Sequence, residues 1–324
     1  MKKLLSFLLC GTMLLGMAAC GEDSTSTEKD TYTVGICQIQ PHVALDAATQ
    51  GFQDALKAEL GDKVTFKVQD AGGDQSACTT IINSFVSENV DLILANATPV
   101  LQTAYNATQT IPILGTSVTE YGVALDIEGF SGTVGGNVSG TSDLAPLDQQ
   151  AALFTELLPD KNTIGLIYCS AEANSKYQVE KVKGYLEAAG KTCKVYTFTD
   201  SNDMAGVCTT AVSECEALYV PTDNTVATYM SILDQVARPA KVPVITGEEG
   251  MCAGGGIATL SISYYDLGYA TGKMAAKILK GEAKISEMPI EYAPEFTKKY
   301  NKAVCDELGI TIPEGYTAIE TSAE

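Results

Sequence analysis

The chain has 324 residues, with 21 Lys and Arg against 40 Asp and Glu, and a formal net charge of −19. This length suggests two domains, and the negative excess repels phosphate backbones, which argues against nucleic acid as a partner. Its single histidine is His42 and its single arginine is Arg238. These scarcities exclude a zinc site built on several histidines, and any histidine-based triad that does not use His42.

The first twenty residues have the features of a secretory leader. Lys2 and Lys3 precede an apolar stretch, 4–19, that is too short for a membrane-spanning helix. Small residues before Cys20 resemble a bacterial lipobox, and the alternative is an ordinary secretory signal with a chance cysteine. We predict a lipoprotein signal peptide over 1–20, lipidation at Cys20 and a flexible tether over 21–30. The mature chain is then extracytoplasmic and lipid-anchored to the bacterial cell membrane.

Eight cysteines remain after the leader, and they form no CxxC pair. Their spacing is wide, and several replace small apolar residues in predicted strands and helices. We therefore expect buried free thiols in preference to disulfides.

From residue 31 onward, short β-rich runs alternate with helical periodicity. The first half predicts strands over 33–37, 64–68, 90–95 and 111–114, and helices over 44–60, 74–87 and 100–107. The second half predicts strands over 163–168, 193–198, 217–220 and 242–245, and helices over 173–189, 202–212 and 224–237. The apolar run 90–95 favours a parallel sheet buried on both faces.

The two halves also share loop chemistry. Asn96-Ala97-Thr98-Pro99 corresponds to Pro221-Thr222-Asp223-Asn224, and the segment 111–116 corresponds to 242–247. The alternative is that all α/β units look alike, but agreement at two successive loops favours a structural duplication.

In the rest of the chain, the residue pattern predicts strands over 257–262, 290–292 and 295–299, and helices over 264–279 and 301–308.

This order predicts an α/β fold of two Rossmann-like lobes with parallel sheets, joined by a hinge that the chain crosses several times. We expect the first lobe to contain residues 31–141 plus about 264–282. The second lobe is expected to contain residues 142–263 plus about 289–324.

In parallel sheets, ligands bind beyond the carboxyl ends of the strands. The loops at these positions are rich in hydroxyl and carboxylate groups and contain no Lys or Arg. Such a site suits a single carboxylate held by Thr98, Ser117 or Ser142 with helix N-termini, and an ammonium held by acidic residues. A zwitterionic amino acid fits both requirements. The predicted ligand-binding residues are Gln38, His42, Thr98, Thr116, Ser117, Thr141, Ser142, Asp143, Asn174, Thr222, Asp223, Asn224 and Glu248.

Each of these residues also has a purely structural interpretation. Asn224 is placed to cap a helix, and Ser and Thr in such loops commonly close turns. For catalysis, the sequence contains no GxSxG elbow, P-loop or HExxH motif. We predict that the protein is not an enzyme and uses no cofactor and no metal. A hydrolase using His42 and a carboxylate remains an alternative, although no accompanying nucleophile is evident.

Several motifs occur in an order that resembles a known family. They are Ile36-Cys37-Gln38, 42–46 (His-Val-Ala-Leu-Asp), 94–99 (Leu-Ala-Asn-Ala-Thr-Pro), 135–143 (Gly-Gly-Asn-Val-Ser-Gly-Thr-Ser-Asp), 219–226 (Tyr-Val-Pro-Thr-Asp-Asn-Thr-Val), Glu249-Gly250-Met251 and 264–269 (Tyr-Tyr-Asp-Leu-Gly-Tyr). With the lipobox, they resemble the ABC-transporter substrate-binding lipoproteins of the tryptophan/tyrosine (TrpX-like) family. The likeness spans about 32–293.

The resemblance implies a periplasmic-binding-protein type I fold and an aromatic or other hydrophobic amino acid as ligand. It also implies a membrane permease and an ATPase as partners, and we expect the protein itself to be a monomer. The family commonly has Glu-His-Pro where this chain has Pro41-His42-Val43, and this difference lies on a loop of the predicted cleft. The alternative is a sensory binding module of the same fold that presents a small ligand to a membrane receptor.

Overall fold

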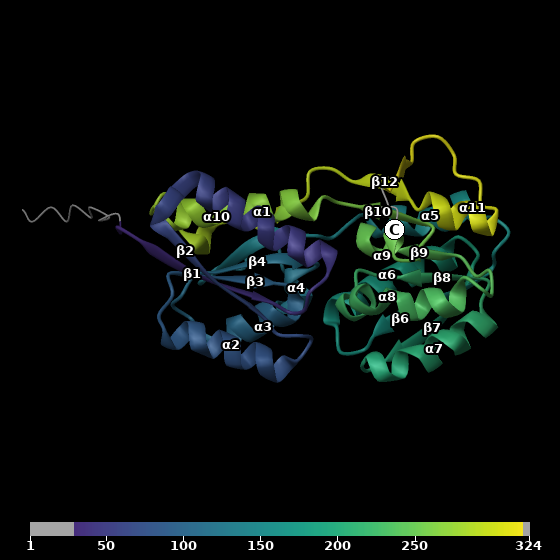
Figure 1. Cartoon of the computed structure of the whole chain (residues 1–324), viewed down its shortest axis with the longest axis horizontal. Helices are drawn as coiled ribbons and strands as arrows, with labels where there is room; N and C mark the ends of the chain where they lie inside the picture. Colours follow the sequence, from purple (N-terminus) through teal and green to yellow (C-terminus); the bar gives the residue numbers. More distant parts are fainter. Residues whose placement is uncertain (1–28, 320–324) are drawn as a thin grey trace, which may run out of the picture.

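The computed structural model describes residues 29–319, and these residues form two α/β lobes side by side (Figure 1). The predicted signal peptide, Cys20 and all but the last two residues of the predicted tether lie outside the described residues. The first lobe is at the left of the figure and the second at the right.

The first lobe contains a six-stranded sheet in the order β11-β5-β4-β3-β1-β2. Its strands are β1 (Tyr32–Gln38), β2 (Val64–Asp70), β3 (Leu92–Asn96), β4 (Ile113–Val118), β5 (Val138–Ser142) and β11 (Glu291–Tyr292). Its helices are α1 (Val43–Leu60), α2 (Gln75–Ser87), α3 (Thr98–Ala107), α4 (Tyr121–Ala124) and α10 (Tyr264–Leu279), with short 3-10 turns η1 (Gly61–Lys63) and η2 (Ile285–Glu287). All strand pairs in this sheet are parallel.

The second lobe contains a seven-stranded sheet in the order β13-β12-β10-β9-β8-β6-β7. Its strands are β6 (Thr163–Cys169), β7 (Thr192–Phe198), β8 (Ala217–Val220), β9 (Val244–Thr246), β10 (Ala258–Ser261), β12 (Thr297–Tyr300) and β13 (Thr317–Ala318). Its helices are α5 (Leu147–Leu157), α6 (Ala173–Ala188), α7 (Ser201–Glu214), α8 (Asn224–Ala237), α9 (Glu249–Ala253) and α11 (Lys302–Leu308). Only β12 runs antiparallel to its neighbour β10 within this described sheet.

The predicted α/β fold with two lobes is confirmed. Both sheets have the same order of sequential strands, β2-β1-β3-β4-β5 in one and β7-β6-β8-β9-β10 in the other. The helix predicted over 264–279 has those bounds, and Asp74 caps α2 through bonds from the backbone N–H groups of Ser76 and Ala77. The sequence pattern does not predict α5 or the short helices α4 and α9.

The chain passes between the lobes three times, between β5 and α5, between β10 and α10, and between β11 and β12. Helix α10 packs along α1 in the first lobe.

The boundary between the lobes near residue 290 differs from the one that the sequence predicts. Residues 289–292 were expected in the second lobe, but Glu291 and Tyr292 pair with Thr141 and Ser142 of β5. The first sheet thereby gains an outer strand, which satisfies the backbone groups at the free edge of β5.

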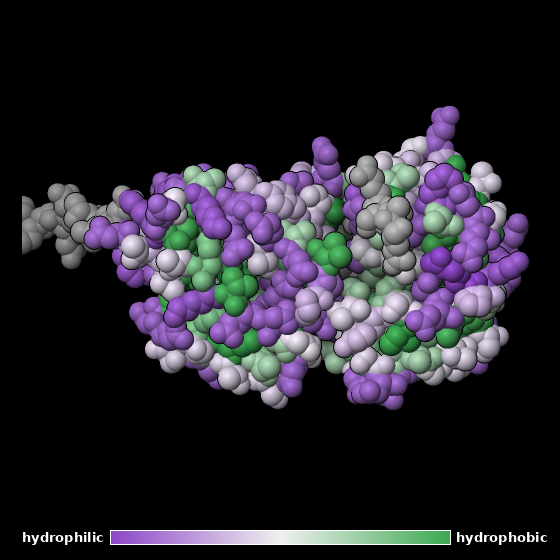
Figure 2. Space-filling view, viewed as in Figure 1, coloured by the Kyte–Doolittle hydropathy of each residue, from purple (hydrophilic) through white to green (hydrophobic). Residues whose placement is uncertain are grey.

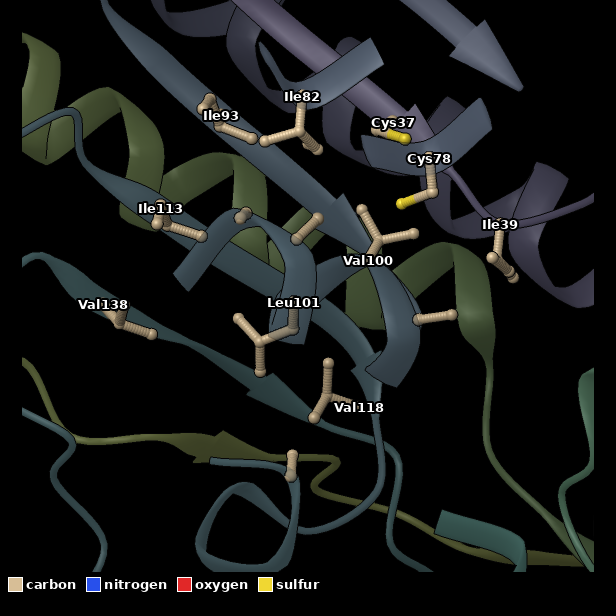
Figure 3. Close-up of a cluster of buried hydrophobic side chains, with 14 of the residues drawn as sticks. Cys37, Ile39, Cys78, Ile82, Ile93, Val100, Leu101, Ile113, Val118 and Val138 are labelled. Carbon is tan, nitrogen blue, oxygen red and sulfur yellow. The ribbon is translucent and has the colours of Figure 1, made fainter. Parts of the chain in front are cut away.

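Each lobe has its own apolar core. In the first lobe, β3 is buried along its whole length, and Ile93 of this strand belongs to one cluster with Ile82, Val100 and Ile113 (Figure 3). All eight cysteines between residues 29 and 319 are free thiols, as the sequence predicts, and all are buried except Cys193, which is only partly buried. Cys37 and Cys78 lie within the core drawn in Figure 3.

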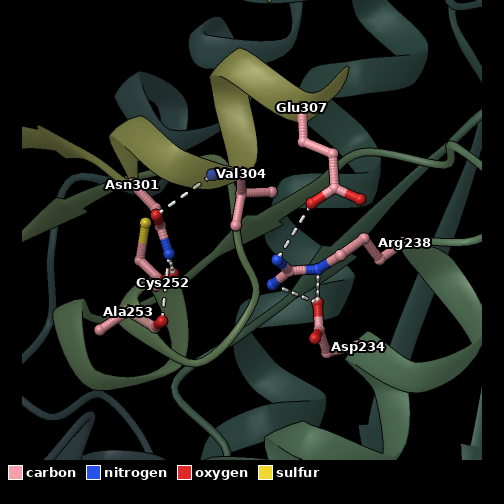
Figure 4. A network of polar contacts seen from close by, with 7 residues as sticks. All are labelled: Asp234, Arg238, Cys252, Ala253, Asn301, Val304 and Glu307. Carbon is pink, nitrogen blue, oxygen red and sulfur yellow. Dashed lines mark hydrogen bonds and ion pairs between the residues drawn. The ribbon is translucent and has the colours of Figure 1, made fainter. Parts of the chain in front are cut away.

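The single arginine has a structural role far from the interface between the lobes. The Arg238 guanidinium lies 2.8 Å from Asp234 in α8 and 3.3 Å from Glu307 in α11, so it joins these two helices (Figure 4). Asn301 caps α11, and its amide nitrogen lies 3.1 Å from the carbonyl oxygens of Cys252 and Ala253. These contacts attach the last helix to the second lobe.

Candidate functional site

The carboxyl ends of the strands of both lobes face one another across a cleft of about 260 Å³. In Figure 2 a notch separates the lobes along the lower edge of the molecule. The cleft is lined by residues of the first lobe (Ile39, Gln40, Gly72, Gly73, Gln75, Pro99, Gln102) and of the second (Cys169, Ala171, Glu172, Thr199, Asp200, Ser201, Asn224, Thr225, Tyr229). Among the described residues, this lining includes no Lys or Arg.

Three neighbouring strand ends of the first lobe align Thr98, Ser117 and Asp143. The Ala97 N–H donates to the Thr116 carbonyl at 3.0 Å, and the Asp143 N–H donates to the Val118 carbonyl at 3.2 Å. Because adjacent strands lie about 4.8 Å apart, these contacts bring the three residues, two with hydroxyl groups and one with a carboxylate, to one edge of the sheet as a row of neighbouring positions.

Two polar atoms of this row are buried without a partner within residues 29–319, namely Ser117 Oγ and Asp143 Oδ1. The other Asp143 oxygen accepts a hydrogen bond from the Tyr264 hydroxyl at 3.0 Å. Burial raises the pKa of Asp143, and the bonds from Tyr264 and Thr119 oppose this effect. An unsatisfied buried polar atom costs about 1–3 kcal/mol, so this edge is built to receive an additional polar group.

The facing edge of the second lobe supplies Asn174 and Glu248. The Asn174 amide nitrogen donates to the Thr222 carbonyl at 2.9 Å, while Asn174 Oδ1 is buried and has no partner in the described part of the chain. Glu248 caps α9 by accepting bonds from the backbone N–H groups of Gly250 and Met251. Burial raises the pKa of Glu248 to about 7, and the charge of Asp143 adds to this shift from across the interface.

A side-chain contact joins the lobes directly. His42, which precedes α1, lies with Nε2 at 3.3 Å from Asn224 Oδ1 at the start of α8. Burial lowers the pKa of His42, although Asn224 and nearby carboxylates oppose the shift. Glu172, which the sequence analysis does not single out, accepts bonds from Asn224 and Thr225. No motif marks this residue, and only its position after β6 indicates a place beside the cleft.

Five of the predicted site residues make their hydrogen bonds within one lobe. Thr116, Thr141 and Thr271 form a chain of hydroxyl contacts at 3.3 and 2.8 Å. The remaining contacts are those of Gln38 with Asp46, Thr49 and Asn96, of Ser142 with the Thr119 carbonyl, and of Thr222 with Gln178. These hydrogen bonds hold the loops in shape.

Asp223 is another residue whose place in the structure differs from the expected role. We expected its carboxylate to hold a ligand ammonium. Its two oxygens instead accept bonds from the Cys169 N–H at 2.8 Å and the Val226 N–H at 2.9 Å, so it caps α8 and ties it to β6. Burial, together with the charge of Glu172, raises the pKa of Asp223.

Helix N-termini around the interface differ in their capping. Helices α2, α7, α8 and α9 have side-chain caps, whereas in the described chain α1, α3 and α6 show none. Uncapped N–H groups and the helix dipole favour an anion. The start of α3, with Thr98, adjoins the row of strand ends that contains Ser117 and Asp143.

A second cavity of about 350 Å³ lies at the connection between the lobes, beside α1 and the start of α10. Its lining includes Val43, Ile262 and Tyr265, and Lys299, which is paired with Glu249. Within residues 29–319, no helix combines the length and apolar character needed to cross a membrane. Those residues also contain no group of three or more His, Cys, Asp and Glu side chains suited to hold a metal ion.

Relatives with this fold are known. A tyrosine-binding protein from Clostridioides difficile is 35% identical over 305 residues, which cover 89% of this chain and 87% of that protein. A structure from Streptococcus pneumoniae, described as an ABC domain in complex with L-Trp, is 36% identical with a TM-score of 0.84, covering 89% of this chain and 100% of that one. The ligand-free, open structure of a substrate-binding protein with adhesive properties from Clostridium difficile is 37% identical with a TM-score of 0.69, covering 90% and 100%.

More distant solved structures, such as a leucine-binding protein from Thermotoga maritima at 12% identity and a TM-score of 0.61, share the fold alone. The family model described as ABC transporter substrate binding protein matches residues 33–322. This match covers almost all of the chain that follows the predicted leader, and it agrees with the resemblance found in the sequence motifs. The chain therefore belongs to the family of ABC transporter substrate-binding proteins.

Proposed function

We propose that the protein captures an aromatic amino acid, tyrosine or tryptophan, between its lobes and delivers it to the permease of an ABC importer. Two relatives at 35–36% identity support this ligand class, one named as tyrosine-binding and one solved with L-Trp. Proteins of this family act outside the cytoplasm. We further propose that Cys20 carries the lipid that anchors the protein as a monomer at the membrane, where it meets the permease and its ATPase.

The observation that carries the proposal is the row of buried, unpaired polar atoms at the edge of the first lobe. The Asp143 carboxylate, which has no cation beside it in the described structure, suits the ligand ammonium. The Ser117 hydroxyl and the uncapped start of α3 at Thr98 suit the ligand carboxylate. Neighbouring strand ends are close enough for one zwitterion to reach both.

The relative position of the lobes supports capture by closure. At nearly equal identity, the chain superimposes better on the L-Trp complex, with a TM-score of 0.84, than on the ligand-free, open structure, with 0.69. We infer that the described structure is a closed form. A ligand that contacts both lobes only when they are closed shifts the population toward that form.

Isothermal titration calorimetry of the purified mature protein against all twenty amino acids tests the proposal. We expect saturable heat with L-Tyr or L-Trp, and none with L-Glu, whose extra negative charge has no cationic partner in the cleft lining. Because the protein contains no tryptophan, a change in indole fluorescence reports bound L-Trp independently. The absence of saturable heat with every amino acid contradicts the proposal.

The ammonium assignment has its own test. Asp143→Asn removes the charge and is expected to weaken binding roughly tenfold or more, because a buried charge pair loses one partner. N-acetyl-L-tyrosine lacks the ammonium, so it should bind the wild type poorly. Its affinities for wild type and for Asp143→Asn should differ less than those of L-Tyr. Asp62→Asn, on the exposed turn after α1, is the matched control. Equal affinity of Asp143→Asn and wild type for L-Tyr, with both folded, shows the assignment to be wrong.

A further inference from the structure

We infer that His42 and Asn224 form a latch that holds the two lobes closed, and that Glu172 positions Asn224 for it. This inference rests on the proposed function only in its kinetic consequence, which is the rate at which a captured amino acid leaves. The contact itself is a property of the protein without ligand.

Glu172 fixes the start of α8 with both carboxylate oxygens. One oxygen accepts from the Asn224 backbone N–H at 2.9 Å and from the Asn224 amide nitrogen at 2.7 Å. The other accepts from the Thr225 N–H and the Thr225 hydroxyl, each at 2.9 Å. Glu172 is buried, with 5% of its surface exposed, so these four bonds are shielded from water and hold the side chain in one orientation.

This arrangement decides which end of the Asn224 amide faces the first lobe. A carboxylate only accepts hydrogen bonds, so the Asn224 nitrogen must face Glu172 and its oxygen must point away. That oxygen meets His42 Nε2 at 3.3 Å, and the imidazole is therefore the donor. With the amide turned by 180°, two nitrogens would face each other and the bond would be lost.

Both partners of the latch sit on rigid parts of their lobes. His42 has an extended backbone immediately before α1, and its carbonyl accepts the first helical bond, from the Asp46 N–H, at 2.9 Å. In the described chain its imidazole makes no capping bond to α1, so the ring is available to the other lobe. Asn224 begins α8 directly after its cap, Asp223. Separation of the lobes therefore has to break this bond, since neither end can follow the other.

The latch also lies between two hollows of the interface. Asn224 and Glu172 line the 260 Å³ cleft, while His42 lines a neighbouring cavity of about 180 Å³ together with Glu248. The acidic groups that act on His42 are Glu172 in the second lobe and Asp46 and Asp70 in the first. Burial outweighs them and lowers the pKa of His42, so the closed form disfavours the imidazolium and a falling pH favours opening.

The kinetic test measures the dissociation rate of L-Trp by stopped-flow indole fluorescence. We expect His42→Ala and Glu172→Gln each to raise this rate roughly tenfold, the equivalent of about 1.4 kcal/mol. The double variant should be no faster than the faster single variant, because both substitutions break the same contact. Glu180→Gln, on the exposed face of α6, is the matched control and should leave the rate unchanged. Unchanged rates in both single variants overturn the latch.

The second readout needs no ligand and would not respond to a merely structural role of Glu172. His42 is the only histidine, so an untagged protein gives a single imidazole signal in a proton NMR titration. In ligand-free protein we expect a pKa below 6.5 for the His42 imidazole of wild type. Loss of the Glu172 charge by itself lowers this pKa, so a higher pKa in Glu172→Gln reports an opening that relieves burial. A pKa that is unchanged or lower in Glu172→Gln, with the variant folded by circular dichroism, overturns the positioning role. Failure of wild type to bind any amino acid instead overturns the proposed function and leaves this titration as the test of the latch.

Discussion

Asp143 and Glu248 are acidic residues buried at the interface between the lobes, one from each side. The charge of Asp143 contributes to the raised pKa of Glu248, and Asp143 accepts its side-chain hydrogen bond from the Tyr264 hydroxyl. Lys299, which lines the cavity beside Glu248, is paired with Glu249. Burying a carboxylate in such surroundings is unfavourable, and proteins usually respond by raising its pKa. A ligand ammonium would supply the positively charged partner that the Asp143 carboxylate lacks in the described structure.

Glu248 gives a prediction at this scale. Burial raises its pKa from 4.5 to about 7, so the folded protein binds this proton more tightly than the unfolded chain does. Its contribution to stability is therefore complete below about pH 4.5 and is lost as the pH rises through about 7, by at most about 3 kcal/mol. Urea unfolding at pH 5 and pH 8 should show a smaller pH-dependent loss of stability in Glu248→Gln than in wild type. The exposed substitution Glu282→Gln should behave as wild type, and an equal loss in all three proteins contradicts the prediction.

At the scale of elements, the close contact of α1 with α10 fixes the hinge side of the first lobe. Gly51 of α1 and Gly268 of α10 lie at this contact, and a Cβ atom at Gly268 would overlap the carbonyl oxygen of Ala48. A Cβ atom at Gly51 would similarly overlap the carbonyl oxygen of Tyr265. Glycine is needed here because backbone, not a flexible side chain, occupies the space.

Gly268→Ala is expected to destabilise the protein by about 2 kcal/mol or more, because two helices have to move apart. Gly184→Ala provides the matched control, since it lies in the exposed interior of α6 and a Cβ atom there meets nothing within 4 Å. That substitution should raise stability by about 0.5–1 kcal/mol through helix propensity. Thermal or urea unfolding measures both, and equal effects of the two substitutions would show that the helix contact is not tight.

At the scale of the whole molecule, three connections allow the lobes to rotate as units around a narrow hinge. The lobes meet through α1 with α9 and through α4 with α6, in addition to the contact of His42 with Asn224. Such contacts are lost when the lobes separate, whereas each lobe retains its own core.

Small-angle X-ray scattering tests this closure. In solution, the ligand-free protein is expected to exchange between closed molecules, held by the contact of His42 with Asn224, and open ones. Its average radius of gyration should therefore exceed that of the protein saturated with L-Tyr, whose curve should match the described coordinates. Asp143→Asn serves as the control, and its curve should reach the compact form only at a concentration of L-Tyr that is higher by the factor by which its affinity is lower. Superimposable curves for wild type with and without a ligand that calorimetry shows to bind would contradict closure.

Local patterns in the sequence determine most of the elements of this protein. Asp74 starts α2 and the periodicity of 264–279 marks α10, because capping and amphipathic spacing depend on residues only a few positions apart. The repeated order of strands and helices also determines the two-lobe fold, and the acidic loops without Lys or Arg indicate a zwitterionic ligand. Helix α5 and strand β5 lack an equally strong local pattern and are not predicted.

The tertiary structure decided which predicted polar residues are available to a ligand. The sequence predicts the same ligand-binding role for Asp223 and Asp143. In the structure, both oxygens of Asp223 accept bonds from backbone N–H groups, whereas Asp143 has a buried oxygen with no partner in residues 29–319. Likewise, the partner of His42 lies 182 positions away, in the other lobe. The sequence determined which groups stand at the strand ends, because that depends on local folding. Only the tertiary structure decided which of them are already paired, because hydrogen-bond partners come from segments that packing brings together.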